Sequence, residues 1–471
     1  MKKTLLISLV LLLSGAICMQ SISSCNKKHR RDQQDSAFTK GKVIPYIECK
    51  KDFSQSYALY LPSYYSEDKK WPVVYAFDSH GKGSLPVELF KGEAEKYGYI
   101  IVGSNNSKNG TPWETTSVLY DTLYSDTHRR LSIDNSRVYT AGFSGGSRVA
   151  SSVAISKGGI NSVIGCGAGF GSQEHPAQKF NYFGIAGNVD MNLNEMITLD
   201  SALEKSGYKH YLEKFNGKHE WPPKTVVSDA FLWLELRAMN DKLKPTNDTL
   251  VKNTFTRWNK EYLTLSDSGK FYKAYLLCGK IINFFDGVKD VTTLKADLKK
   301  LSENAAVISA KKHLQVISFE EAALQSHYMN ALSTQTTAWW ANEVTLINGK
   351  INASTDNEEK FMYKRVLNYL SLVTYMNINA LLKSAQFEEA LKFNTIYALV
   401  DPENPEHAYI SATLSMKNHK SADAMSFLET AAKLGFAEPD RLESDTVMST
   451  LKDQPKYSGI LDSIKNNANK K

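Results

Sequence analysis

Short runs rich in β-branched and aromatic residues alternate with stretches of helical periodicity between residues 43 and 240. Several of these runs are almost continuously apolar, as expected for strands buried on both faces of a mostly parallel sheet. The alternation predicts a three-layer α/β domain, in which helices cover both faces of the sheet. The expected strands are Val43–Cys49, Tyr57–Leu61, Pro72–Phe77, Tyr99–Ser104, Arg137–Ala141, Ser162–Gly167, Phe183–Gly187 and Tyr208–Phe215. The expected helices are Leu85–Lys96, Ser117–Arg130, Ser147–Ser156, Asn194–Ser206 and Thr225–Met239.

The pattern changes at residues 244–248, and helical periodicity dominates from there to the C-terminus. A shift of 34 residues aligns Tyr375 with Tyr409, Leu382 with Met416, Ala390 with Ala424, and Ala398 with Ala432. This period and the segment 385–391 resemble the helix–turn–helix unit of tetratricopeptide repeats, and residues 269–274 resemble the same turn. We therefore predict an α/β domain at 43–243 and an all-α helical-repeat domain at 249–471, with the repeats clearest at 370–436. A generic helical bundle is the alternative.

One pentapeptide carries a strong chemical signal. Gly142-Phe143-Ser144-Gly145-Gly146 follows the expected strand Arg137–Ala141 and opens the expected helix at Ser147. A serine at a sharp strand-to-helix turn, with glycines two residues to either side, is the pattern of a nucleophile elbow. The backbone N–H of Gly145 and the helix N-terminus would then face a developing oxyanion. A glycine-rich turn that binds phosphate is the alternative.

Two further residues follow Ser144 in the chain order of an α/β-hydrolase triad, which is serine, acid, histidine. Asp190 comes directly after the strand Phe183–Gly187, and His219 lies in the loop after the last expected strand. Ser144 would attack an ester or amide carbonyl while His219 accepts its proton. Asp190 would hold the imidazole in the required tautomer.

Three segments resemble those of secreted esterases in the feruloyl esterase and polyhydroxybutyrate depolymerase group of α/β-hydrolases. They are Gly142–Gly146, Gly187–Asp190 and Gly217–Pro222, within a resemblance that covers about residues 45–240. It implies an α/β-hydrolase fold with Ser144, Asp190 and His219 as the triad. That group usually has leucine-histidine-glycine after its third strand, whereas this chain has Phe77-Asp78-Ser79-His80-Gly81-Lys82-Gly83. The position of this segment predicts a second oxyanion donor from the backbone of Lys82 or Gly81.

A polar loop follows the expected strand Tyr99–Ser104 at the same edge of the sheet. Asn105, Asn106 and Trp113 are candidates to contact a sugar or an aryl group, and a solvated turn is the alternative. The stretch between Ser144 and Asp190 is filled by one helix and two strands, which leaves no room for a large lid. An open cleft for esters carried on a larger molecule is therefore expected. The histidines show no metal-ligand spacing, so we predict no metal and no other cofactor.

The N-terminus has the pattern of an export signal. Lys2 and Lys3 precede the apolar run Leu5–Ala16, which is too short to cross a bilayer as a helix. Cys25 follows Ile22-Ser23-Ser24, which resembles a bacterial lipobox with lipid attached to the cysteine sulfur. We predict a signal peptide at 1–24, a lipidated tether at 25–42 and a bacterial cell-envelope lipoprotein, periplasmic or on the surface. A secreted protein is the alternative.

The net charge of +7 comes mostly from this N-terminal part, where Lys2, Lys3, Lys27, Lys28, Arg30 and Arg31 lie. The remaining chain has almost no basic excess, which excludes nucleic acid as a partner. The other cysteines, Cys49, Cys166 and Cys278, are widely spaced and odd in number, and we expect buried free thiols.

The leading functional hypothesis is a serine hydrolase that cleaves acyl or feruloyl-type carboxylic esters, such as those on polysaccharide, through an acyl-enzyme. One alternative is a serine peptidase on the same fold. The other is a non-catalytic envelope scaffold that binds a protein or peptide partner through the helical repeats.

Overall fold

The computed structural model describes residues 38–171 and 178–469. The predicted signal peptide and the predicted lipid attachment residue, Cys25, lie outside these residues. The last residues of the predicted tether, 38–42, lie against the sheet domain. The guanidinium of Arg130 stacks 4.5 Å from the ring centroid of Phe38, and the Gly41 N–H donates to the carbonyl oxygen of Leu61 at 2.8 Å. Phe38 supplies the apolar contact that holds this end of the segment to the fold.

A sheet of eight strands forms the centre of the first domain, in the order β1-β2-β4-β3-β5-β6-β7-β8. β2 is antiparallel to both β1 and β4, and all other neighbours are parallel. This is the α/β-hydrolase arrangement, so the predicted fold class is confirmed. The strands are β1 (Val43–Glu48), β2 (Ser56–Tyr60), β3 (Trp71–Phe77), β4 (Ile100–Ser104), β5 (Ile133–Phe143), β6 (Ser162–Cys166), β7 (Asn181–Gly187) and β8 (His210–Phe215).

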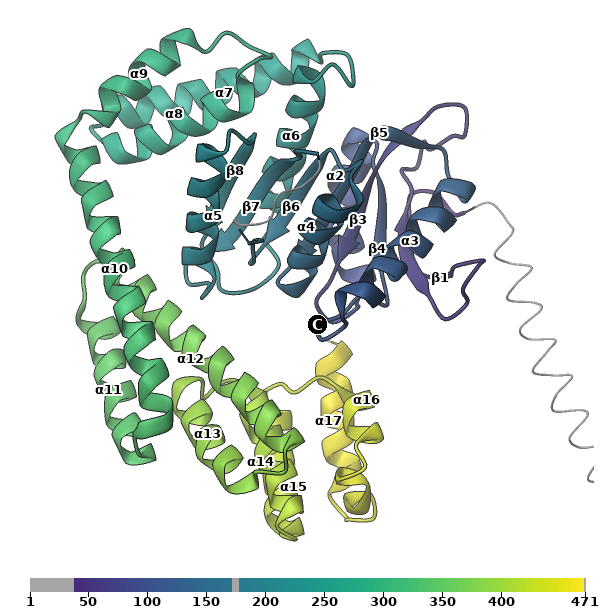
Figure 1. The fold of residues 1–471 in the computed structure, drawn as a ribbon, viewed down its shortest axis with the longest axis vertical. Helices are drawn as coiled ribbons and strands as arrows, with labels where there is room; N and C mark the ends of the chain where they lie inside the picture. The colour runs from purple at the N-terminus through teal and green to yellow at the C-terminus, as the bar shows by residue number, and fades with distance from the viewer. Residues whose placement is uncertain (1–37, 172–177, 470–471) are drawn as a thin grey trace, which may run out of the picture.

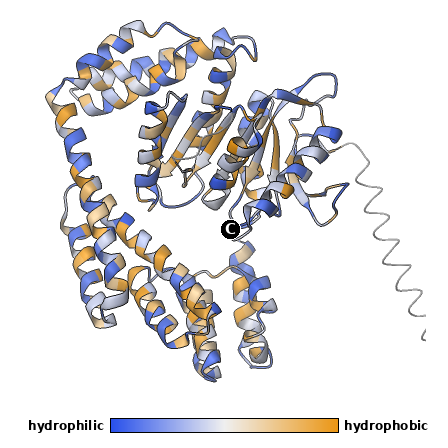
Figure 2. Cartoon of the chain, viewed as in Figure 1, coloured by the Kyte–Doolittle hydropathy of each residue, from blue (hydrophilic) through white to orange (hydrophobic). Residues whose placement is uncertain are grey.

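Helices cover both faces of this sheet (Figure 1). One apolar cluster joins the sheet to α2 and α6, and a second cluster on the opposite face joins it to α3, α4 and α5. Figure 2 shows apolar residues concentrated in the strands, while the covering helices alternate apolar and polar residues. These helices are α2 (Ser84–Tyr97), α3 (Trp113–Arg130), α4 (Gly145–Lys157), α5 (Leu193–Lys205) and α6 (Lys224–Asn240).

The first three helices after the predicted boundary share the apolar core of the sheet domain. They are α7 (Asp248–Asp267), α8 (Phe271–Phe285) and α9 (Thr292–Ser302). Trp258 and Phe284 pack with ring centroids 5.0 Å apart, and Phe284 lies 6.1 Å from Phe183 of β7. The secondary structure therefore changes at residues 241–247, but the core continues across that point.

The remaining helices curve away from the sheet domain and return toward it (Figure 1). Within the described residues, no helix is both long enough and apolar enough to span a bilayer. The helices are α10 (Ala305–Thr334), α11 (Thr337–Ala353), α12 (Asn357–Lys383), α13 (Phe387–Val400), α14 (Pro405–Lys417), α15 (Ser421–Lys433), α16 (Pro439–Ser444) and α17 (Tyr457–Asn469), with a short 3₁₀ turn at Met448–Leu451.

The turns singled out by the sequence repeat share one backbone conformation. Ala385 between α12 and α13, and His419 between α14 and α15, have φ angles of 57° and 59°. Gly269, in the fragment at 269–274, has a φ angle of 72° between α7 and α8. Ala390 on α13 and Ala424 on α15 are fully buried. The 34-residue shift thus relates two turns of the same backbone conformation, whereas the helices before them differ in length, with 27 residues in α12 and 13 in α14.

The three cysteines within the described residues are buried free thiols, as predicted. Burial raises the pKa of the Cys278 thiol to about 11, so this side chain is a protonated core residue at neutral pH.

Candidate active site

Ser144 lies between the end of β5 and the start of α4, with a φ angle of 55° and a ψ angle of −121°. This conformation is strained for a residue with a side chain and turns the serine outward at the carboxyl edge of the sheet. A Cβ atom at Gly142 would overlap the carbonyl oxygen of Gly146, and one at Gly146 would overlap that of Phe77. The turn therefore needs these two glycines and has the geometry of a nucleophile elbow.

Ser144, His219 and Asp190 form a continuous hydrogen-bonded chain. The distance from Ser144 Oγ to His219 Nε2 is 2.8 Å, and His219 Nδ1 lies 3.0 Å from both carboxylate oxygens of Asp190. The Asp190 side chain is 1% exposed, and its Oδ1 also accepts the Asn192 backbone N–H at 2.8 Å. With Nδ1 donating to the carboxylate, Nε2 accepts the Ser144 hydroxyl proton, which is the arrangement that activates a serine.

The loops that carry Asp190 and His219 are joined through their backbones. The N–H of Asn188 donates to the carbonyl oxygen of Phe215 at 2.8 Å, and the N–H of Val189 donates to that of Gly217 at 3.1 Å. A Cβ atom at Gly187 would overlap the carbonyl oxygens of Gly217 and Lys218, so only glycine permits this approach. The acid and the histidine are thereby fixed relative to each other.

The segment after β3 differs from the prediction. The N–H of Gly81 donates to the Asp78 carbonyl oxygen at 3.1 Å, and the N–H of Lys82 donates to Asp78 Oδ1 at 3.3 Å. Both amides predicted as oxyanion donors are thus directed to Asp78, that of Gly81 to its backbone carbonyl and that of Lys82 to its buried carboxylate. A Cβ atom added to Gly146 would lie 3.3 Å from the carbonyl carbon of Asp78. The N–H that follows this carbonyl, that of Ser79, is therefore beside the elbow.

Asp78 also links this turn to the histidine loop. Its Oδ1 accepts the His80 N–H at 2.9 Å, and its Oδ2 accepts Trp221 Nε1–H at 3.0 Å. The rings of Phe143 and His219 lie 4.7 Å apart, and Trp221 packs 5.6 Å from Phe143. These aromatic rings restrict the position of the imidazole. Asp78 was not among the residues predicted for the site, although its place directly after a central strand is a usable signal.

The polar loop after β4 reaches the elbow through a different residue from those predicted. The Asn105 Nδ2 group donates to the carbonyl oxygen of Pro45 at 3.2 Å, and the Asn106 side chain accepts the Ser56 N–H at 2.8 Å. Both side chains tie the loop to the edge strands, and Trp113 begins α3 and packs on the apolar cluster of that face. Asn109 contacts the elbow instead, because its Oδ1 occupies the space that a Cβ at Gly145 would need.

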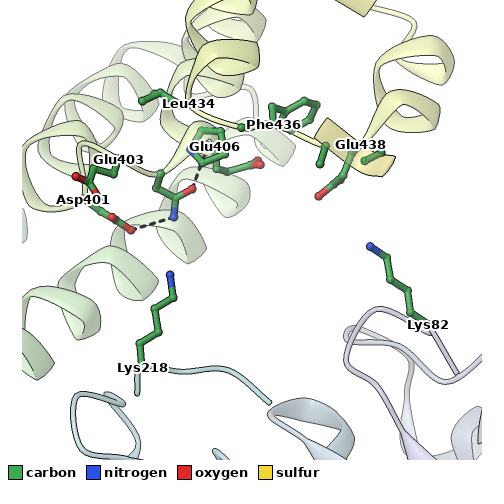
Figure 3. Close-up of a pocket in the computed structure, with 13 residues that line it drawn as sticks. Lys82, Lys218, Asp401, Glu403, Glu406, Leu434, Phe436 and Glu438 are labelled. Atoms are coloured by element: carbon green, nitrogen blue, oxygen red, sulfur yellow. Dashed lines mark hydrogen bonds between the residues drawn. The ribbon is translucent and has the colours of Figure 1, made fainter. Parts of the chain in front are cut away.

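A cavity of about 620 Å³ lies between the loops that carry Lys82 and Lys218 and the C-terminal helices. Figure 3 shows Lys82 and Lys218 reaching into it from the α/β domain, toward acidic residues of the helical half. The C-terminal helices thus supply a wall opposite Lys82 and Lys218. The residues on that wall are Asp401, Glu403, Asn404, Pro405, Glu406, Leu434, Gly435, Phe436, Ala437, Glu438 and Ala468.

Within the described ranges, no group of three or more histidine, cysteine, aspartate or glutamate side chains could hold a metal ion. The site consists of protein groups suited to acyl transfer: a serine hydroxyl, an imidazole, a carboxylate and backbone amides.

No model of a protein family matches the sequence, and no curated protein matches it. The solved structure of an S-formylglutathione hydrolase from Staphylococcus aureus is similar over 41% of this chain and 97% of that protein, at 13% identity and a TM-score of 0.35. A ferulic acid esterase is similar over 42% of this chain and 98% of that protein, at 16% identity and a TM-score of 0.35. An esterase from the archaeon Pyrobaculum calidifontis is similar over 42% of this chain and 87% of that protein, at 13% identity and a TM-score of 0.34. Each similarity spans most of the other protein and less than half of this one.

Proposed function

We propose that this protein is a serine hydrolase that cleaves carboxylic esters through an acyl-enzyme. The observation that carries the proposal is the chain of hydrogen bonds from Ser144 through His219 to the buried Asp190. The strained backbone of Ser144 supports it, because proteins retain such strain where it presents a reactive group.

In the proposed reaction, Ser144 Oγ attacks the ester carbonyl carbon while His219 Nε2 takes the hydroxyl proton. The oxyanion is stabilised by the N–H of Gly145, one of the first amides of α4 that lack an intrahelical partner, and by that of Ser79. His219 then gives its proton to the departing alkoxide. Water, deprotonated by His219, hydrolyses the acyl-enzyme and restores Ser144. Asp190 stabilises the imidazolium in both halves of the cycle.

The cavity lined by Lys82 and by Lys218, the neighbour of His219 in the chain, supports a polar substrate. Its lining combines lysine ammonium groups with carboxylates, which suit hydroxyl-rich groups better than a long acyl chain. We therefore propose esters whose alcohol is hydrophilic, such as acyl or feruloyl groups on a carbohydrate. Attachment through lipid on Cys25 would display this activity at the cell envelope.

The decisive experiment is the Ser144→Ala substitution. Hydrolysis of p-nitrophenyl acetate should fall by roughly 10⁴-fold or more, because the nucleophile is lost while the fold is kept. Ser156→Ala, at an exposed position on α4, is the matched control and should hydrolyse the ester like the wild type. Retained hydrolysis by Ser144→Ala would refute the proposal. Faster turnover of peptide p-nitroanilides than of aryl esters would replace the esterase by a peptidase.

A further inference from the structure

Two side chains of the helical half bind the backbone of the loop that carries Asp190. Arg365 Nη1 donates to the carbonyl oxygen of Asn188 at 2.7 Å, and Asn368 Nδ2 donates to that of Val189 at 2.7 Å. Both donors lie on α12, 177 and 179 residues away in sequence from the carbonyls that they bind. The two residues immediately before the acid are thus held by the helical half.

Arg365 is itself held by a buried ion pair. Its Nε donates to both carboxylate oxygens of Glu321 at 3.0 and 2.9 Å, and its Nη2 donates to Oε2 at 2.6 Å. The side chains of Arg365 and Glu321 are 4% and 0% exposed. A planar guanidinium bound in this way has a single orientation, so its remaining N–H groups point in a fixed direction. Glu321, on α10, therefore orients Arg365 toward the loop at residues 188–190, the acid loop.

The loop is consequently fixed from two sides. The N–H groups of Asn188 and Val189 bind the end of β8 and the loop that carries His219, and their carbonyl oxygens bind α12. Removal of a donor leaves a part-buried carbonyl oxygen without its partner, which favours rotation of the peptide. Rotation of either peptide would move Asp190 relative to His219 Nδ1.

We infer that Arg365 and Asn368 are positioning residues for the triad, so that the helical half completes the active site rather than only binding a partner. The expected effect on turnover rests on the proposed function. The dependence of the Asp190 position on α12 does not depend on which reaction the site performs. The inference assigns the acid loop a geometry that depends on docking of α12.

Asn368→Ala tests this inference, because it removes one neutral hydrogen bond and leaves the Arg365–Glu321 pair intact. We expect kcat for p-nitrophenyl acetate to fall by about 10-fold with KM little changed, since displacement of a catalytic group affects the chemical step. Asn377→Ala is the matched control, because the Asn377 amide lies on the same helix and binds that helix's own Val373 carbonyl. Its kcat should equal that of the wild type.

A second measurement separates positioning from general damage to the helix. The proton between His219 Nδ1 and Asp190 gives a downfield NMR signal, which we expect to shift or broaden in Asn368→Ala and to persist in Asn377→Ala. An unchanged signal in Asn368→Ala, or an equal loss of kcat in Asn377→Ala, would overturn the inference. The signal can be read even if the wild type hydrolyses no ester, so failure of the proposed function is distinguishable from failure of the inference.

Discussion

At the scale of single residues, one carboxylate organises two catalytic loops. Asp78 binds the backbone of the turn after β3 and the indole of Trp221, which lies two residues after His219. No local sequence pattern in either loop predicts this contact, because Asp78 and Trp221 are 143 residues apart. Asp78 therefore belongs to the support of the site rather than to the reacting groups.

Replacing this carboxylate should impair both loops together. Both carboxylate oxygens of Asp78 accept hydrogen bonds from N–H groups. In Asp78→Asn, one of these oxygens is replaced by an N–H₂ group that cannot accept, so at least one buried hydrogen bond is lost. We expect a loss of about 1–3 kcal/mol in the free energy of unfolding and a fall in kcat of about 10²-fold. Urea denaturation and p-nitrophenyl acetate hydrolysis measure the two effects. Trp221→Phe, which removes only the indole bond, should have the milder phenotype, and wild-type kcat in Asp78→Asn would rule out this role.

His210 provides a pH-dependent contribution to stability. Burial opposes protonation of the ring, but hydrogen bonds and charge from Asp200 and Glu204, at 2.7 and 3.0 Å, outweigh it and raise the pKa of His210. A histidine with a raised pKa in the folded state stabilises the fold fully below its unfolded pKa of about 6.5, and this contribution is lost as pH rises through the folded pKa.

His210→Gln tests this linkage. The loss of unfolding free energy relative to the wild type should be larger at about pH 5.5 than at about pH 8.5, because only the charged ring gains from the two carboxylates. Urea denaturation at the two pH values provides the comparison. A loss that does not change with pH would show that the ring is held by packing alone.

At the scale of elements, the repeat turns carry a removable strain. Ala385 and His419 adopt the left-handed conformation, which costs a residue with a Cβ roughly 1–2 kcal/mol, whereas Gly269 adopts it freely in the related turn. Ala385→Gly and His419→Gly should each raise the free energy of unfolding by about 1 kcal/mol, and Gly269→Ala should lower it by a similar amount. Thermal melting of the three variants checks the signs. Destabilisation by both glycine substitutions would contradict the assignment of strain.

The elements themselves were predictable from local patterns. Every expected strand and helix of the first domain is present, since buried apolar runs and helical periodicity carry their own signal. The largest shifts are at α3, which begins at Trp113, and at β5, which begins at Ile133, each four residues earlier than expected. At α3, the polar loop before the helix obscures its first turn. Ser144, Asp190 and His219 could be proposed because each lies in the turn or loop that follows a strand at the same edge of the sheet.

The supporting residues of the site could not be predicted in this way. Asn109 resembles its neighbours Asn105 and Asn106 in sequence, and only the path of the loop decides which asparagine reaches Gly145. Arg365 binds a carbonyl 177 residues away, and a charged residue on an amphipathic helix usually faces solvent. Such contacts depend on how the helical half docks, which no short segment specifies.

At the scale of the whole molecule, the helical half is divided by its packing. Helices α7–α9 complete the core of the sheet domain, whereas α10–α17 form separate apolar clusters and return to the catalytic edge. The division in packing therefore falls nearer residue 303 than residue 243.

Truncation at these two positions should give different results. A chain that ends at residue 243 exposes the apolar face that Trp258 and Phe284 cover, and we expect it to aggregate or to melt without cooperativity. A chain that ends at residue 303 keeps this core and should melt cooperatively, but it lacks α12 and should hydrolyse p-nitrophenyl acetate at least about 10-fold more slowly. Circular dichroism and ester hydrolysis report the two outcomes. A shorter chain as stable as the longer one would contradict the shared core.

The most direct test of the central claim is labelling of the folded wild-type protein with a fluorophosphonate, followed by mass spectrometry of the modified peptide. We predict rapid modification confined to Ser144, slowed by several orders of magnitude in His219→Ala, because the serine depends on the imidazole to lose its proton. Absence of label on Ser144, or equal labelling rates with and without His219, would contradict the account.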